Sequence, residues 1–101
     1  MLIAIMFHLI ITTDYNGTNA CTMGSFSANK HIQIEPKSLY LQNDVYKYIK
    51  LNNGYSAVFI NSCGAYCLAI VQWKINGVVY TVNLKNGTEV ETIEIANSVY
   101  D

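Results

Sequence analysis

Two apolar segments of strand length flank an Asn-Gly pair in the C-terminal half of the chain. The first is CLAIVQWKI, residues 67–75, and the second is VVYTVNL, residues 78–84. Asn76 and Gly77 between them tolerate the positive φ that a two-residue type I′ turn requires, so the pattern predicts a β-hairpin. A third segment, TEVETIEI at residues 88–95, alternates acidic with apolar residues and predicts a further strand. We therefore expect an antiparallel meander.

The segments before the meander predict more strands and one ambiguous element. YSAVFI, residues 55–60, follows another Asn-Gly pair, and HIQIE, residues 31–35, alternates up to Pro36, so both predict strands. Residues 38–52 have apolar side chains at helical spacing, which favours a helix. The residues at that spacing are Leu41, Val45, Tyr48 and Ile49. The Tyr-Lys-Tyr-Ile-Lys alternation in the same segment is the argument for a strand instead.

The N-terminal residues 1–13, MLIAIMFHLIITT, are apolar but fall short of the roughly 20 residues needed to span a bilayer. No Lys or Arg precedes the apolar run, as one would in a signal peptide, so a buried strand is favoured over a targeting segment. His8 is then expected to be a core or interface residue. Residues 14–29, rich in Asn, Thr, Ser and Gly, are expected to form the longest loop.

Composition narrows the classes of function. The chain has 101 residues, which predicts a single domain over residues 1–101, and it is 51% hydrophobic but only 13% charged. It contains no arginine, and its lysines are spread along the sequence. Because nucleic-acid backbones are bound by clustered basic side chains, nucleic-acid binding is disfavoured. The net charge of −1 gives weak protection against self-association, so a homo-oligomer is expected.

Tyrosine is abundant, with eight copies. A tyrosine buries a large area at low entropic cost and keeps a polar tip, which suits a recognition surface, although it is also a common strand residue. The candidate interaction residues are Tyr46, Tyr48, Tyr55, Tyr66 and Tyr80. The sequence has no Gly-rich phosphate loop and no zinc-binding helix motif, so neither a cofactor nor a metal is expected.

The three cysteines, Cys21, Cys63 and Cys67, lack the spacing of a metal site. On a single strand, the rise per residue would separate the Cα atoms of Cys63 and Cys67 by roughly 13 Å, beyond disulfide reach. We therefore expect no bond between these two, whereas Cys21 could pair with either. An odd cysteine count without an evident disulfide framework favours a reducing compartment.

The segment SCGAYCLAIVQW, residues 62–73, resembles the nucleophile segment of viral and SUMO-specific cysteine proteases, and it is similar to the Cys-Gly start of bacteriocin-exporter peptidase domains. The resemblance implies that Cys63 heads a helix as the nucleophile, with His31 or His8 as its base. The exporter peptidases place their histidine after the cysteine, whereas no histidine follows His31 here. The same residues cannot form both this helix and the predicted hairpin, and the Asn-Gly turn favours the hairpin.

These patterns predict an α+β domain dominated by an antiparallel sheet of five to seven strands, with a C-terminal meander and one helix near residues 38–52. An all-β barrel or sandwich is the alternative. The expected function is that of a small non-enzymatic interaction or structural protein, acting through a sheet edge or an apolar, tyrosine-rich face. Orphan proteins of viruses and phages share this general character.

Two other functions stay open: a cysteine hydrolase that uses Cys63, and a small secreted toxin or effector. The expected partner is another protein or a second copy of the chain, with no nucleic acid, no cofactor and no membrane span. An intracellular location, in a host cytoplasm or a virion, is favoured over secretion.

Overall fold

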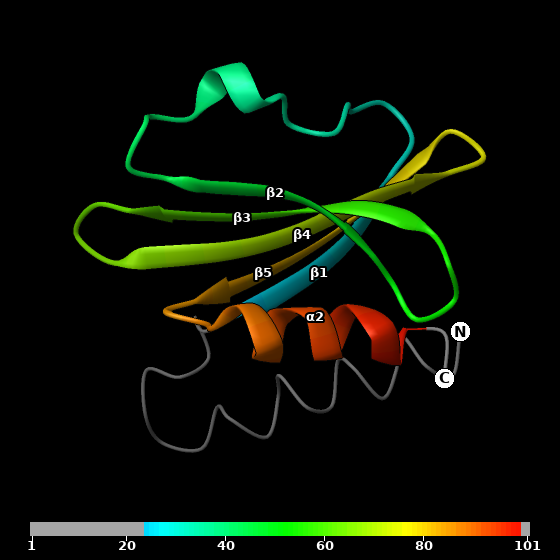
Figure 1. Cartoon of the computed structure of the whole chain (residues 1–101). Helices are drawn as coiled ribbons and strands as arrows, with labels where there is room; N and C mark the ends of the chain where they lie inside the picture. The colour runs from blue at the N-terminus through cyan, green and yellow to red at the C-terminus, as the bar shows by residue number, and fades with distance from the viewer. Residues whose placement is uncertain (1–23, 100–101) are drawn as a thin grey trace.

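The computed structural model describes residues 24–99, which form one five-stranded sheet with an α-helix packed on it (Figure 1). The elements are β1 (Gly24–Asn29), the 3₁₀ helix η2 (Lys37–Leu39), β2 (Val45–Lys50), β3 (Ser56–Cys63), β4 (Cys67–Ile75), β5 (Val78–Lys85) and α2 (Glu89–Ser98). The strand order is β1-β5-β4-β3-β2, and every neighbouring pair is antiparallel. The predicted α+β class is confirmed. The sheet is open, so the alternative of a barrel or sandwich is wrong.

The predicted C-terminal hairpin is also confirmed. β4 and β5 pair along their whole length, with Trp73 opposite Tyr80. The turn residues Asn76 and Gly77 have φ values of 53° and 81°, as a type I′ turn requires. Local turn chemistry therefore determines which residues of β4 and β5 face one another.

The strand predicted at residues 55–60 is confirmed as β3, and a tight hairpin joins it to β2. The Leu51 N–H donates to the Tyr55 carbonyl at 2.9 Å, and the Gly54 N–H donates to the Leu51 carbonyl at 2.8 Å. Gly54 has φ of 92°, a conformation that glycine adopts without steric cost. This second Asn-Gly pair thus closes a hairpin in which the positive φ falls on the glycine.

The helix expected near residues 38–52 is wrong. This segment contains η2 and then β2, which pairs residue for residue with β3. Pairing with β3 packs Ile49 against the core, whereas Leu41 and Tyr48, two residues of the supposed helical face, are exposed. Sheet pairing therefore overrides the helical spacing of the apolar residues.

The α-helix of the described residues lies instead where a strand was expected, at residues 88–95. Thr88 and Glu91 form a capping box at its start: the Glu91 N–H donates to the Thr88 hydroxyl at 3.1 Å, and the Thr88 N–H donates to the Glu91 carboxylate at 3.0 Å. Thr92 and Ala96, four residues apart, are buried. The Thr-x-x-Glu signal for a helix start outweighs the alternation of acidic and apolar residues.

Two further predictions are wrong in the region before β2. Residues 31–35 form no strand and belong to the connection between β1 and β2. Residues 24–29, expected to end the longest loop, form β1, which pairs with β5. The rest of that predicted loop and the predicted strand at residues 1–13, with His8, lie outside the described residues.

Each face of the sheet is covered by a different segment, with α2 below the sheet and the connection that contains η2 above it in Figure 1. On the α2 face the core includes Phe59, Val71 and Trp73. On the opposite face, Val58, Ile60 and Ile70 pack against Ile34 and Tyr40 of the connection, among others. Within residues 24–99, no helix is long and apolar enough to cross a membrane.

Candidate functional site

β2 lies at one edge of the sheet and directs backbone groups outward. The Leu51 N–H bonds to the Tyr55 carbonyl, so the alternation of an antiparallel ladder turns the N–H and C=O groups of Tyr46, Tyr48 and Lys50 away from β3. None of the described residues forms a hydrogen bond to these outward groups. An unpaired edge of this kind is a template for pairing with another chain.

Exposed apolar side chains occur in β2 and in the segment that leads into it. Four large apolar residues within residues 39–48 are exposed; we call them the β2 edge surface: Leu39 (66% exposed), Leu41 (78%), Val45 (38%) and Tyr48 (78%). Single exposed apolar side chains are common on proteins, but a group of them more often indicates a binding surface. Val45 and Tyr48 lie on β2 itself, on opposite faces of the sheet, and Leu39 and Leu41 lie in the connection that leads into it.

Three tyrosines form a row on the sheet face opposite α2. The ring centroids of Tyr40 and Tyr46 are 6.0 Å apart, and those of Tyr46 and Tyr48 are 5.7 Å apart with the rings edge to face. Both distances are typical of favourable aromatic pairs. The row connects the exposed Tyr48 to the covered interior of this face.

Glu35 fixes two tyrosines of the row and is itself bound to the sheet. The Tyr46 hydroxyl donates to the Glu35 carbonyl at 2.5 Å, and the Tyr40 hydroxyl donates to the Glu35 carboxylate. The Glu35 N–H donates to the Gln72 side chain at 2.8 Å, and Gln72 donates to the Thr81 hydroxyl at 3.0 Å. Because Gln72 and Thr81 are buried, this network anchors the connection to the middle of the sheet.

The environment keeps both tyrosine hydroxyls protonated. Burial, followed by the hydrogen bond to the Glu35 carboxylate, raises the pKa of Tyr40 far above its ordinary value near 10. Burial also raises the pKa of Tyr46, with the neighbouring Tyr48 as the next cause. Both hydroxyls therefore stay protonated, and remain hydrogen-bond donors, further into alkaline pH than an ordinary tyrosine.

The other three candidate tyrosines lie elsewhere. Tyr55 and Tyr66 flank opposite ends of β3, and the Lys85 ammonium lies 4.7 Å from the centre of the Tyr66 ring. Tyr80 is half-buried on the α2 face, where its ring stacks on Trp73 at 5.6 Å. Of the five tyrosines predicted as one surface, only Tyr46 and Tyr48 are neighbours in this row.

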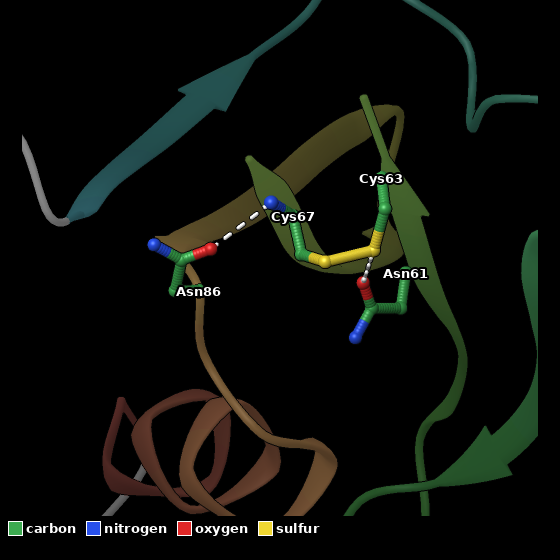
Figure 2. The surroundings of a disulfide bond; sticks show 4 residues. All are labelled: Asn61, Cys63, Cys67 and Asn86. Carbon is green, nitrogen blue, oxygen red and sulfur yellow. Dashed lines mark hydrogen bonds between the residues drawn. A yellow bond between two sulfur atoms is a disulfide. The ribbon is translucent and has the colours of Figure 1, made fainter. Parts of the chain in front are cut away.

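The expectation that Cys63 and Cys67 do not bond is wrong: Figure 2 shows a disulfide between them. They are directly opposed across the β3–β4 hairpin, with Cα atoms 3.9 Å apart. The turn at residues 64–66 folds the chain back between the two cysteines, so the distance along a single strand was the wrong measure. The signal in the sequence was the Gly64 that follows Cys63, since glycine favours turns.

Asparagines surround the disulfide (Figure 2). The Cys67 N–H donates to the Asn86 side-chain oxygen at 3.0 Å, and the Asn86 N–H donates to the Cys67 carbonyl at 2.7 Å. The Asn61 side-chain oxygen lies 3.7 Å from the Cys63 sulfur, a contact without a donated proton because a bonded sulfur carries none. Asn86 thus joins the start of β4 to the end of β5.

This geometry differs from the nucleophile segment that the protease resemblance implies. Cys63 is the last residue of β3, its sulfur is bonded, and the residues expected to form the helix belong largely to β4. His31 lies exposed on the connection between β1 and β2, and His8 is outside the described residues. Across residues 24–99, no group of three or more His, Cys, Asp or Glu side chains could hold a metal ion.

Two surface features therefore remain as candidates for function. The β2 edge combines an open backbone with exposed apolar side chains, and the disulfide closes one hairpin covalently. Comparison with protein-family models, with curated proteins and with solved structures finds no match to this chain.

Proposed function

We propose that the protein is a small interaction or structural protein that binds another polypeptide strand along the edge of β2. The observation that supports this proposal is the outward-facing backbone of Tyr46, Tyr48 and Lys50 beside the β2 edge surface. When a strand adds to a sheet edge, main-chain hydrogen bonds supply affinity, and pockets for alternate side chains supply specificity.

β2 has few of the devices that protect an edge strand from pairing. Protected edges use bulges, prolines, very short strands or charged side chains. β2 has six residues, no proline, and a ladder to β3 without a bulge. Of its two lysines, Lys47 bonds to Glu89 of α2 at 2.8 Å, and Lys50 forms no ion pair with any of residues 24–99.

The support beneath the edge is ordered before any partner binds. Tyr46 is fixed by the Glu35 carbonyl, and Tyr48 packs against Tyr46. The Asp44 carboxylate accepts the Leu41 N–H at 2.8 Å, which fixes the turn that leads into β2. A preorganised surface loses less conformational entropy on binding, which favours affinity.

A site-specific photo-crosslinker tests the proposal. A benzophenone amino acid replaces Tyr48 in one variant and Val90 in a control variant, since Val90 is 67% exposed on α2. In an extract of the source cells, we expect ultraviolet light to give a defined crosslinked polypeptide from position 48 and none from position 90. The same product from both positions, or no product from either, would contradict the proposal.

The disulfide supports a second proposal, about the compartment. We propose that the protein acts in an oxidising compartment, as the secreted alternative requires, because disulfides persist there and are rare in the cytosol. Alkylation of the protein, unfolded without reductant, is expected to leave Cys63 and Cys67 unlabelled and to label both after reduction. If both were labelled without reductant in freshly isolated native protein, this proposal would fail.

A further inference from the structure

We infer that the strand bound at the β2 edge is β2 of a second copy of this chain, so that two sheets join into one across a two-fold axis. The inference rests on the proposed function, because it uses the same edge. It also goes further, since it names the partner and the register. A two-fold interface must be self-complementary, and β2 can be examined for that property residue by residue.

Two geometrical conditions restrict the register. In a continuous antiparallel sheet, directly opposed side chains point to the same face, so the two paired residue numbers must both be even or both be odd. The outward-facing residues Tyr46, Tyr48 and Lys50 must also pair among themselves, because within β2 only their N–H and C=O groups have no partner among residues 24–99. Two registers that satisfy both conditions pair five residues of β2 in each copy.

Charge separates the two registers. One register is centred on Lys47 and sets this residue directly opposite Lys47 of the second copy. Because the Lys47–Glu89 pair is partly exposed to solvent, it does not cancel the repulsion between these two like charges. The other is centred on Tyr48, so that Tyr48 faces Tyr48, Tyr46 faces Lys50 and Lys47 faces Ile49. No two like charges are directly opposed in this second register, and it is the one we infer.

The side-chain chemistry of the Tyr48-centred register is favourable on both faces of the sheet. On the face with the tyrosine row, each Lys50 ammonium lies opposite a Tyr46 ring, which attracts cations, and the two Tyr48 rings form a cross-strand aromatic pair. On the α2 face, Lys47 keeps its bond to Glu89, and its aliphatic stem lies opposite Ile49. Each contact other than the central pair occurs twice by symmetry.

The overall charge does not oppose this assembly. The chain has a net charge of −1, so repulsion between two copies is weak. The exposed Val45 is the first residue of β2, so it lies next to the paired residues 46–50 and adds apolar area there. Self-pairing thus covers the exposed Tyr48 at the centre of the paired segment.

Disulfide trapping in purified protein tests both the partner and the register. In a Cys21→Ser background, Tyr48→Cys would place the introduced sulfurs on a directly opposed, hydrogen-bonded pair with Cα atoms about 5.5 Å apart, within disulfide range. Tyr46→Cys is the matched control on the same strand and face, where the two positions would be roughly 13 Å apart. Val90→Cys is the remote control. Under mild oxidation we expect Tyr48→Cys to form covalent dimer at least tenfold faster than either control.

Two other outcomes would overturn the inference. Equal rates for the three variants would exclude pairing at this edge, and faster trapping of Lys47→Cys than of Tyr48→Cys would exclude the inferred register.

Light scattering supplies a second readout. Because the Tyr48 N–H points away from β3, Tyr48→Pro removes a hydrogen bond to the second copy and none of the ladder within the sheet. We expect dimers for the wild type and for Tyr48→Thr, and a folded monomer for Tyr48→Pro. If Tyr48→Pro fails to fold, the trapping series still decides.

The failures of the inference and of the proposed function are distinguishable. A monomeric wild type whose position 48 photo-crosslinks a different protein, while position 90 does not, overturns the second copy as partner and retains the proposed function. A monomeric wild type with no crosslink at position 48 overturns both.

Discussion

The two faces of the sheet are covered by segments whose backbone groups find their hydrogen-bond partners in different ways. α2 is a regular helix whose backbone groups bond to one another, so its backbone needs no polar partners in the apolar face formed by Phe59, Val71 and Trp73. The connection on the opposite face has no such internal pattern, and its Glu35 N–H bonds instead to the buried Gln72. An irregular cover therefore requires polar side chains inside the sheet, because buried backbone groups need partners.

The largest loss of stability is expected for a substitution in the core on the α2 face. Trp73 is fully buried there and stacks on Tyr80, so Trp73→Ala is expected to lower the free energy of unfolding by about 4 kcal/mol. A smaller deletion on the opposite face is Ile60→Val, which removes one methylene from a fully buried residue and is expected to cost about 1 kcal/mol. Chemical denaturation measures both. A cost below about 1 kcal/mol for Trp73→Ala would show that α2 does not close this core.

On the opposite face, the largest loss of stability is expected for a substitution of Gln72. Gln72→Leu leaves the Glu35 N–H and the Thr81 hydroxyl without partners, at a cost of about 2 kcal/mol, and it should speed hydrogen exchange at the Glu35 amide. Thr81→Val serves as the second arm of a double-mutant cycle. Because the double variant removes both groups of one bond, its cost should be less than the sum of the single costs. Strictly additive costs would show that this bond does not stabilise the fold.

A smaller effect is expected at the start of α2. Thr88→Ala removes the hydroxyl that accepts the Glu91 N–H, and it is expected to lower the free energy of unfolding by about 1 kcal/mol. Thr88→Ser keeps a hydroxyl and should stay close to the wild type. Thermal unfolding followed by circular dichroism compares the two variants, and equal losses would exclude the capping box as their cause.

The smallest change in stability is expected for Tyr40, and it is expected only at alkaline pH. Its pKa is raised in the folded state, so above about pH 10 the unfolded chain loses this proton while the folded protein retains it. The contribution of Tyr40 to the free energy of unfolding is therefore fully present below pH 10 and is lost as the pH rises further. Denaturation between pH 8 and 11 should show a shallower loss for Tyr40→Phe than for the wild type, with Tyr48→Phe as the control. An unchanged profile for Tyr40→Phe would contradict the role of this hydroxyl.

The sequence predicts the C-terminal hairpin to within a residue because its information is local: two β-rich segments and an Asn-Gly turn define it. The helix at residues 89–98 was missed although Thr88 and Glu91 provide a start signal, since the alternation of acidic and apolar residues suggested a strand. For residues 45–50 the helical spacing of the apolar residues favoured a helix, and although residues 55–60 were predicted as a strand, their pairing with residues 45–50 was not recognised.

The candidate site was predictable only in part. Tyr46 and Tyr48 were among the tyrosines proposed as a surface, but their separation from Tyr80 depends on which face of the sheet each strand residue occupies. Glu35 gave no signal, because its role depends on Gln72, 37 residues further along the chain. Cys63 and Cys67 were treated as residues of one strand, so the turn that brings them together was overlooked.

The position of β1 beside β5 has a consequence for the order of folding. Asn29 pairs with Val79, fifty residues later, whereas the β3–β4 and β4–β5 hairpins pair neighbouring segments. Contacts between distant residues form late because closing a long loop costs entropy first. At about 5 to 20 residues per second, a ribosome needs roughly 3 to 10 s to make the chain between these two residues. β1 is therefore synthesised before every other described strand, and we expect it to pair last.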